Sequence, residues 1–285
     1  MNRRSASVAA LIVAIGSFGL LYRPILVRLW QDWATDDNYS HGFLILPLAA
    51  YFVWERRDRL AGTATRPSLA GLVLLVGGLL VLLAGRLGAE LFLTRMSLVI
   101  VLAGAVWFVL GGPALRVLAF PLAFLILMIP IPAIVFNQIA FPLQLVASQA
   151  GAAALSALSI PVLREGNVII LAHTSLEVAE ACSGIRSLIS LLTLGIVYGY
   201  FTDPRGGVRV AIALATVPIA IVANAARVAG TGIAAHYYGP EAAQGFFHTF
   251  SGWLVFVVAL ALLFLLTRAL LRMIPPPAAV PLLAR

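Results

Sequence analysis

Three residues with side chains suited to catalysis lie far apart in this chain of 285 residues: Cys182, Arg227 and His248. Cys182, the only cysteine, stands where a polar segment gives way to an apolar run in "LEVAEACSGIRSLISLLTLGIVYGY". Arg227 lies within the apolar segment "VANAARVAGTG", and His248 opens another in "FFHTFSGW". A thiol nucleophile, a histidine acid–base and a guanidinium that stabilises negative charge are the parts of a cysteine-dependent acyl transfer.

Neighbouring residues favour this chemistry. A helix that starts at Ser183 would put Cys182 in its first turn, where unpaired N–H groups and the helix dipole favour a thiolate. Arg186, four residues further on, would share its face and add to that effect, and Asn224 shares the face of Arg227 one turn earlier. An arginine inside an apolar helix costs about 2.5–3.5 kcal/mol, so Arg227 should face protein or a wet cavity.

Each of these residues also has a structural explanation. A lone buried cysteine is usually inert packing, and an arginine near a helix end often reaches to lipid phosphates. All four histidines (His41, His173, His236 and His248) fall on the same side of the topology given below, so physical chemistry alone does not single out His248. One cysteine also excludes an intramolecular disulfide and offers no zinc-site spacing, so we expect no metal and no cofactor.

The composition requires a membrane. Hydrophobic residues make up 62% of the chain and charged residues 11%, with a mean hydropathy of +1.03, which no soluble domain of this length could bury. All 19 basic residues are arginines placed between apolar runs, as topology signals are, so the net charge of +8 does not indicate nucleic acid. We expect one membrane domain over residues 1–274 and a short cytoplasmic tail, 275–285.

The predicted fold class is an all-α polytopic membrane protein of about eight transmembrane helices. The segment 138–158, interrupted by Pro142, predicts an interfacial or re-entrant helix. The Glu-Gly-Asn turn that follows, between β-branched runs, predicts a small β-hairpin on the outer face. The apolar runs that predict spans lie at about 6–22, 42–54, 68–85, 91–110, 115–136, 184–201, 209–235 and 248–271.

The distribution of arginines sets an orientation. Alternating the predicted spans puts twelve of the nineteen arginines on the side of both termini and most acidic residues on the other. Positive-inside bias therefore predicts cytoplasmic termini. Arg227 lies 18 residues after Arg209, about 27 Å along a helix, so it should reach the outer boundary, where Cys182 and His248 also lie.

Three blocks of this sequence resemble the signature blocks of the exosortase family, bacterial relatives of archaeosortase. They are "EACSGIRSL", "NAARVAGTG" and "FFHTFSGW", and they occur in the family's order. The N-terminal stretch "WATDDNYSHGFLILPLAAYFVWERR" resembles a further recurrent block, so the resemblance covers most of the chain. It implies a cysteine transpeptidase of the bacterial inner membrane, with Cys182, Arg227 and His248 as its catalytic residues and its active site facing the periplasm.

The resemblance also implies partners. The substrates would be membrane-anchored proteins with a C-terminal Pro-Glu-Pro sorting signal, cleaved through a thioester on Cys182 and transferred to a lipid or glycan acceptor. Two other functions stay open. One is an intramembrane cysteine protease with water as acceptor, and the other is a non-enzymatic transporter or flippase for lipid-linked sugars.

Four residues receive supporting roles. Arg186 could hold the thiolate, bind substrate or pair with an acid, and Asn224 accompanies Arg227. Tyr39 and His41, in "DDNYSHGF", are expected to shape the path by which substrate approaches. The alternative for that segment is a hydrated loop with a helix cap.

Overall fold

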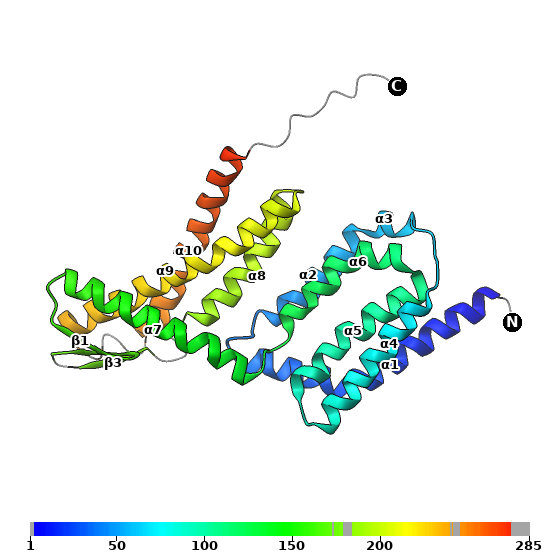
Figure 1. The fold of residues 1–285 in the computed structure, drawn as a ribbon, viewed down its shortest axis with the longest axis horizontal. Coiled ribbons are helices and arrows are strands. Elements are labelled where there is room, and N and C mark those ends of the chain that lie inside the picture. The colour runs from blue at the N-terminus through cyan, green and yellow to red at the C-terminus, as the bar shows by residue number, and fades with distance from the viewer. Residues whose placement is uncertain (1–2, 173, 179–183, 240, 242–245, 275–285) are drawn as a thin grey trace, which may run out of the picture. The chain divides into compact units, whose positions relative to one another are not determined.

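The computed structural model describes residues 3–172, 174–178, 184–239, 241 and 246–274, with the backbone alone for 3–8, 10, 11 and 246–249. The chain divides into two compact units, residues 1–133 and 134–285, which are described separately below. Figure 1 shows that helices dominate both units and that the strands of the described part belong to the second.

The first unit contains helices α1 (Arg3–Thr35), α2 (Gly42–Glu55), α3 (Arg57–Ala61), α4 (Leu69–Leu87), α5 (Leu91–Leu110) and α6 (Gly112–Phe124), and the 3-10 helix η1 (Leu125–Met128). The second contains α7 (Ala133–Ala157), β1 (Val162–Glu165), β2 (Val168–Leu171), β3 (Ser175–Glu177), α8 (Ile185–Thr202), α9 (Gly206–Tyr238) and α10 (Phe246–Met273).

The protein is a multi-pass membrane protein, and the predicted fold class is confirmed. Among the described residues, seven helices are long and apolar enough to cross a membrane: α1, α4, α5, α7, α8, α9 and α10. Residues 42–55 and 112–128 form shorter apolar helices. Many large apolar side chains on these helices are exposed, as lipid-facing surfaces require.

Two helix boundaries differ from the prediction. α1 continues to Thr35 rather than ending near residue 22, because buried Tyr22, Ile25, Leu29 and Trp33 recur at helical spacing beyond the apolar run. The run expected at 115–136 ends as helix at Met128. The sequence "IPIP" follows, and its prolines lack the N–H and disfavour helix in the preceding residue.

The segment expected to be interfacial belongs to α7. This helix is continuous over 25 residues and contains Pro142. Its length and hydropathy fit a membrane span. An interfacial placement for residues 138–158 stays a prediction.

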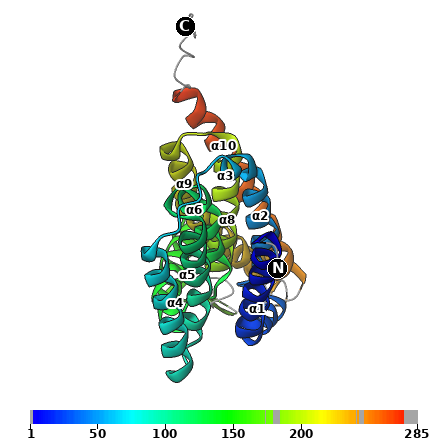
Figure 2. The same cartoon turned by 90° about the vertical axis from the view of Figure 1, so that its right-hand side faces the viewer.

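Close contact between α4 and α5 organises the first unit. Gly71, Gly78 and Gly85 recur every seven residues on α4 and are buried. A Cβ on Gly71 would lie 2.1 Å from the backbone nitrogen of Phe108, and one on Gly78 would lie 2.7 Å from Cγ2 of Val101. The glycines therefore let the two helices approach as small-residue stripes do in membranes. Figure 2 shows α4 beside α5.

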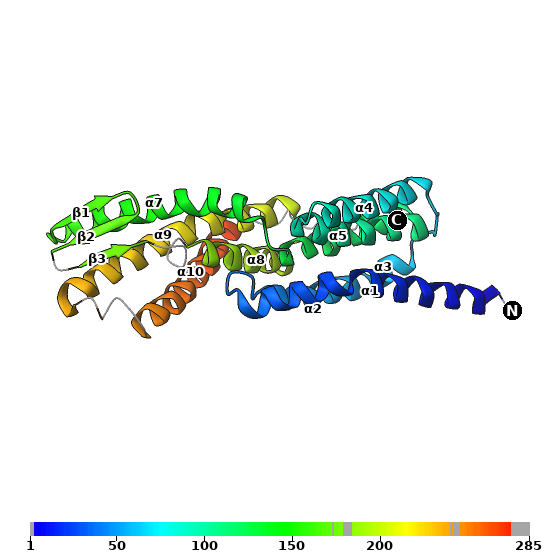
Figure 3. The same cartoon turned by 90° about the horizontal axis from the view of Figure 1, so that it is seen from below.

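A three-stranded antiparallel sheet in the order β1-β2-β3 confirms and extends the predicted hairpin. β1 and β2 join through Gly166 and Asn167, and Gly166 has a φ of +62°. A glycine with positive φ suits the first position of a two-residue hairpin turn. β3, only three residues long, was not predicted. Ile169 of β2 packs with Leu155 of α7 and Val228 of α9, and Figure 3 shows the sheet beside α7.

Helices α8, α9 and α10 form a bundle around a core that includes Leu191, Ile212 and Leu263. Arg205 marks one end, because its Nη2 donates to Oδ2 of Asp203 at 2.7 Å and to the carbonyl of Ile274 at 3.0 Å. The end of α8, the start of α9 and the end of α10 therefore meet there. The start of α8, the later part of α9 and the start of α10 meet at the opposite end.

Candidate functional site

The connection into α8 lies directly on α9. Gly184, the residue before α8, has a left-handed φ of +80°. A Cβ at this position would lie 2.8 Å from both Cβ and Cγ of Asn224. Asn224 is buried at 4% exposure. Only glycine combines this backbone conformation with so close an approach, so Gly184 fixes the start of α8 against Asn224.

Arg227, one turn after Asn224, reaches across to α10. Its Nε donates to Oγ of Ser251 at 3.4 Å. A Cβ on Gly252 would lie 3.2 Å from Nη2 and 3.3 Å from Cζ of Arg227. The guanidinium thus lies against the backbone of α10 where that helix lacks a side chain. Within one turn of α9, Asn224 therefore contacts the start of α8 and Arg227 contacts α10.

The start of α8 corrects one step of the sequence argument. The helix begins at Ile185, two residues later than the expected start at Ser183. Because Gly184 is left-handed, no α-helix runs from Cys182 to Arg186, and the argument that these two share a helical face does not apply. Arg186 is the second residue of α8 and is half-buried.

Two of the predicted catalytic side chains are not placed. Cys182 lies outside the described residues, and for His248 the structure describes the first turn of α10 but not the side chain. Their neighbours are described. Gly184 follows Cys182 by two residues, and Ser251 and Gly252 follow position 248 by three and four.

The sheet holds the chain on the other side of Cys182. Val178 is 2% exposed and shares a core with Val228, the residue after Arg227. Its N–H donates to the carbonyl of Asn167 at 2.9 Å, and its own carbonyl accepts from Nδ2 of Asn167 at 3.3 Å. Sequence reasoning assigned Asn167 to a turn but not this role, which depends on the unpredicted strand β3.

Residues 33–265 match the family model of the transmembrane exosortases. The chain belongs to the transmembrane exosortase family. The match includes Cys182, Arg227 and His248, and also Tyr39, His41, Arg186 and Asn224. No curated protein and no solved structure matches the chain. Membership of the exosortase family supports a membrane-embedded, sortase-like enzyme.

In this exosortase, Tyr39 and His41 lie in the first unit and are buried at 8% and 9% exposure. Nε2 of His41 bonds the carbonyl of Leu127 at 3.1 Å, and the Tyr39 hydroxyl bonds the backbone of Ile131. Burial raises the pKa of Tyr39 and lowers the pKa of His41. These bonds satisfy backbone groups where helix η1 breaks at the prolines. A role in guiding substrate stays a prediction.

The described part of the exosortase chain contains no group of three or more His, Cys, Asp or Glu side chains that could hold a metal ion. Next to Gly184, a cavity of about 10 Å³ is lined by Leu143, Leu188 and Ala220. This volume is close to the minimum for one water molecule, so it is not a substrate pocket.

Proposed function

We propose that this chain is a membrane-embedded cysteine transpeptidase that cleaves the C-terminal sorting signals of membrane-anchored proteins and transfers the proteins to a surface acceptor. Besides family membership, one structural observation supports this proposal. The described neighbours of Cys182 and His248 contact the same turn of α9, through Asn224 and Arg227.

Covalent geometry limits how far the undescribed groups can lie from this turn. Two residues span at most about 7 Å, so the backbone of Cys182 lies within that distance of Gly184. Gly184 in turn adjoins Asn224, one turn from Arg227. At helical spacing, position 248 is expected to share a face of α10 with Ser251 and Gly252. We therefore expect both partners to lie near Arg227.

The proposed orientation follows from the two ends of the bundle. Arg205 and Arg227 are 22 residues apart, about 33 Å along α9, which matches the thickness of a bilayer core. The end with Arg205 also carries Arg209, Arg268 and Arg272, so positive-inside bias assigns it to the cytoplasm. We therefore place Arg227 at the periplasmic boundary of the inner membrane, with both termini cytoplasmic.

The proposed reaction has two stages. The thiolate of Cys182 attacks the scissile carbonyl, and Arg227 stabilises the negative charge that develops on its oxygen. His248 gives a proton to the leaving amine, and a thioester remains on Cys182. His248 then removes the proton of an acceptor hydroxyl or amine on a lipid or glycan. The acceptor attacks the thioester and regenerates the thiolate.

Two further residues have positioning roles in this proposal. Asn224 supports the backbone between Cys182 and α8 through its contact with Gly184. Arg186, in the first turn of α8, adds positive charge near the start of that helix and favours the thiolate.

The test uses the full chain in membranes with a tagged substrate that carries a Pro-Glu-Pro signal, a membrane helix and a basic tail. We expect wild type to form a covalent adduct at Cys182 and to shorten the substrate, and Cys182→Ala to do neither. Arg227→Lys should lower turnover, because an ammonium cannot replace a planar, bidentate donor. Arg23→Lys, at an exposed position on α1, is the matched control.

Normal processing by Cys182→Ala would exclude the nucleophile assignment. Mass spectrometry of the product's new C-terminus separates the related chemistry. An attached acceptor supports transpeptidation, whereas a free carboxylate indicates that water is the acceptor and the enzyme is a protease. Absence of both adduct and cleavage in wild type would favour the transporter alternative.

A further inference from the structure

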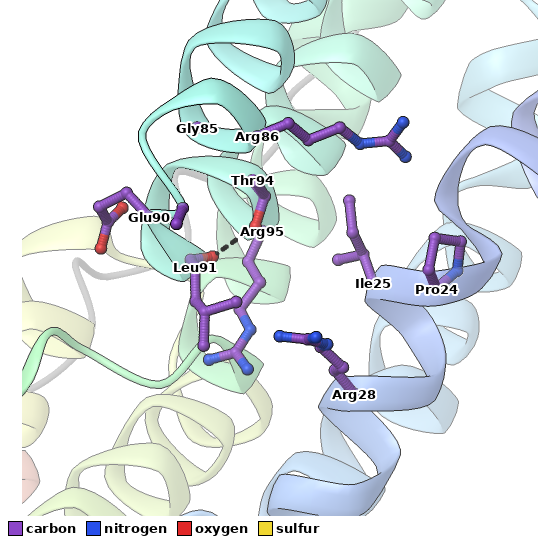
Figure 4. A pocket seen from close by; sticks show the side chains of 10 residues that line it. Pro24, Ile25, Arg28, Gly85, Arg86, Glu90, Leu91, Thr94 and Arg95 are labelled. Carbon is purple, nitrogen blue, oxygen red and sulfur yellow. Dashed lines mark hydrogen bonds between the residues drawn. The ribbon is translucent and has the colours of Figure 1, made fainter.

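A cavity of about 300 Å³ in the first unit lies between α1, the end of α4 and the start of α5. Its wall includes one arginine from each helix: Arg28, Arg86 and Arg95. Figure 4 shows the guanidinium groups of Arg28 and Arg95 turned toward one another. Apolar Ile25 and Leu91 also line the cavity. Three cations therefore line one cavity in the first unit.

Carboxylates balance these cations only in part. Asp32 forms an ion pair with Arg95. Glu90 also lines the cavity, but its Oε2 accepts a backbone N–H and so caps α5, and its carboxylate points away from Arg28 and Arg95. In the described part of the chain, no carboxylate lies within ion-pair distance of Arg28 or Arg86. The hollow thus keeps an excess of positive charge.

Arg28 and Arg86 are exposed at this cavity, and only Arg95 is buried. Arg95 is 5% exposed, so its charge is largely removed from water, unlike that of an arginine that extends to the membrane surface. Because the guanidinium groups of Arg28 and Arg95 face each other, an anion between them would form charge-assisted hydrogen bonds with both. An arginine held inside an apolar bundle generally serves a binding or transport function.

The positions of the three arginines on their helices predict that the cavity lies at headgroup depth. Arg28 is seven residues, about 10 Å, before the end of α1, Arg86 is in the last turn of α4, and Arg95 is four residues into α5. Apolar side chains nearby on α4 are exposed, with Leu83 at 52% and Leu87 at 80%. A ligand with a charged head and an apolar tail fits this combination of surfaces.

We propose that this cavity binds the phosphate of an anionic phospholipid. Arg28 and Arg95 hold the phosphate oxygens between them, and Arg86, whose Nη2 already donates to the carbonyl of Leu21 at 2.8 Å, closes the side toward α4. The acyl chains lie along the exposed apolar surface of α4. The site belongs entirely to the first unit, so it does not depend on the cysteine chemistry proposed above.

The test is a binding titration of the purified full chain in detergent, followed by thermal stabilisation and native mass spectrometry. The probes are dioctanoyl phosphatidylglycerol, dioctanoyl phosphatidylcholine and inorganic phosphate. The variants are Arg28→Gln, Arg28→Gln with Arg86→Gln, and Arg23→Gln as the charge-matched control on α1. Arg28→Gln removes a charge without breaking a structural contact, because Arg28 has no hydrogen bond or ion pair to any described residue.

We expect phosphatidylglycerol to bind wild type and Arg23→Gln equally. Arg28→Gln should raise its Kd about tenfold or more, the effect of losing one charge-assisted contact, and the double variant should raise it further. Unchanged affinity in the double variant would refute the site. An equal loss in Arg23→Gln would show diffuse surface attraction instead. Equal binding of phosphatidylcholine would refute the preference for anionic lipid, and displacement by millimolar inorganic phosphate would assign the cavity to a free anion.

Discussion

Replacing Gly252 by alanine tests whether the contact between α9 and α10 serves catalysis. The new Cβ would lie 3.2 Å from Nη2 and 3.3 Å from Cζ of Arg227, whereas unstrained contacts need about 3.5–4.0 Å. The guanidinium must therefore move by roughly 0.3–0.5 Å, which disturbs its bond to Ser251. A misplacement of 1 Å can cost about 100-fold in rate, so a logarithmic interpolation gives about a four- to tenfold loss.

The same substitution should not destabilise the protein. Alanine is favoured over glycine within a helix by about 0.5–1 kcal/mol, so the Tm of Gly252→Ala should be equal to or above that of wild type. Gly230→Ala is the matched control, because Gly230 lies on α9 near Arg227, is exposed, and has nothing within 4 Å of an added Cβ. It should gain the same helix stability and keep wild-type turnover.

The measurement is the initial rate of signal cleavage in isolated membranes, paired with thermal unfolding in detergent. Loss of rate in Gly252→Ala with an unchanged Tm supports a positioning role for α10 on Arg227. If Gly252→Ala and the bulkier Gly252→Leu both cleave at the rate of Gly230→Ala, the position of the guanidinium does not matter to the reaction. The assignment of Arg227 would then be wrong even if the fold is right.

Three further predictions concern other contacts. Gly184→Ala should lower both Tm and cleavage, because a left-handed alanine costs about 1–2 kcal/mol and its Cβ would collide with Asn224. Gly78→Leu should lower Tm by overpacking α4 against α5, whereas Gly77→Leu, with open space around it, should not. Because burial lowers the pKa of His41, the unfolded chain binds the proton more readily. Tm should therefore be highest above about pH 6.5 and fall below it, and His41→Gln should reduce that dependence between pH 5 and 8.

The sequence predicts the class of fold well, because apolar runs and arginine placement are strong signals in a membrane protein. It fails where helices are amphipathic rather than uniformly apolar. Tyr22 and Trp33 extend α1 beyond its apolar run, and hydropathy alone does not register their periodic burial. The stripe of Gly71, Gly78 and Gly85 is visible in the sequence, but nothing local shows that α5 is the helix it contacts.

For the candidate site, too, the sequence predicts some features and misses others. The types and order of Cys182, Arg227 and His248 predict a cysteine-dependent acyl transfer, and the family match supports a membrane-embedded, sortase-like enzyme. The start of α8 was misplaced because "CSGI" permits a helix from Ser183, and only the left-handed φ of Gly184 shows that it starts later. The role of Asn167 requires a strand of three residues, too short to give a periodic signal.

The sequence blocks around Cys182 and His248 each contain a glycine that contacts a side chain of α9. Gly184 follows Cys182 by two residues and touches Asn224, and Gly252 follows His248 by four and touches Arg227. Each glycine lets a backbone come within side-chain distance of α9, and we expect this approach to bring Cys182 and His248 toward the same turn. Leucine at position 252 should lower turnover by more than the four- to tenfold loss expected of Gly252→Ala, although Cys182, Arg227 and His248 are all unchanged.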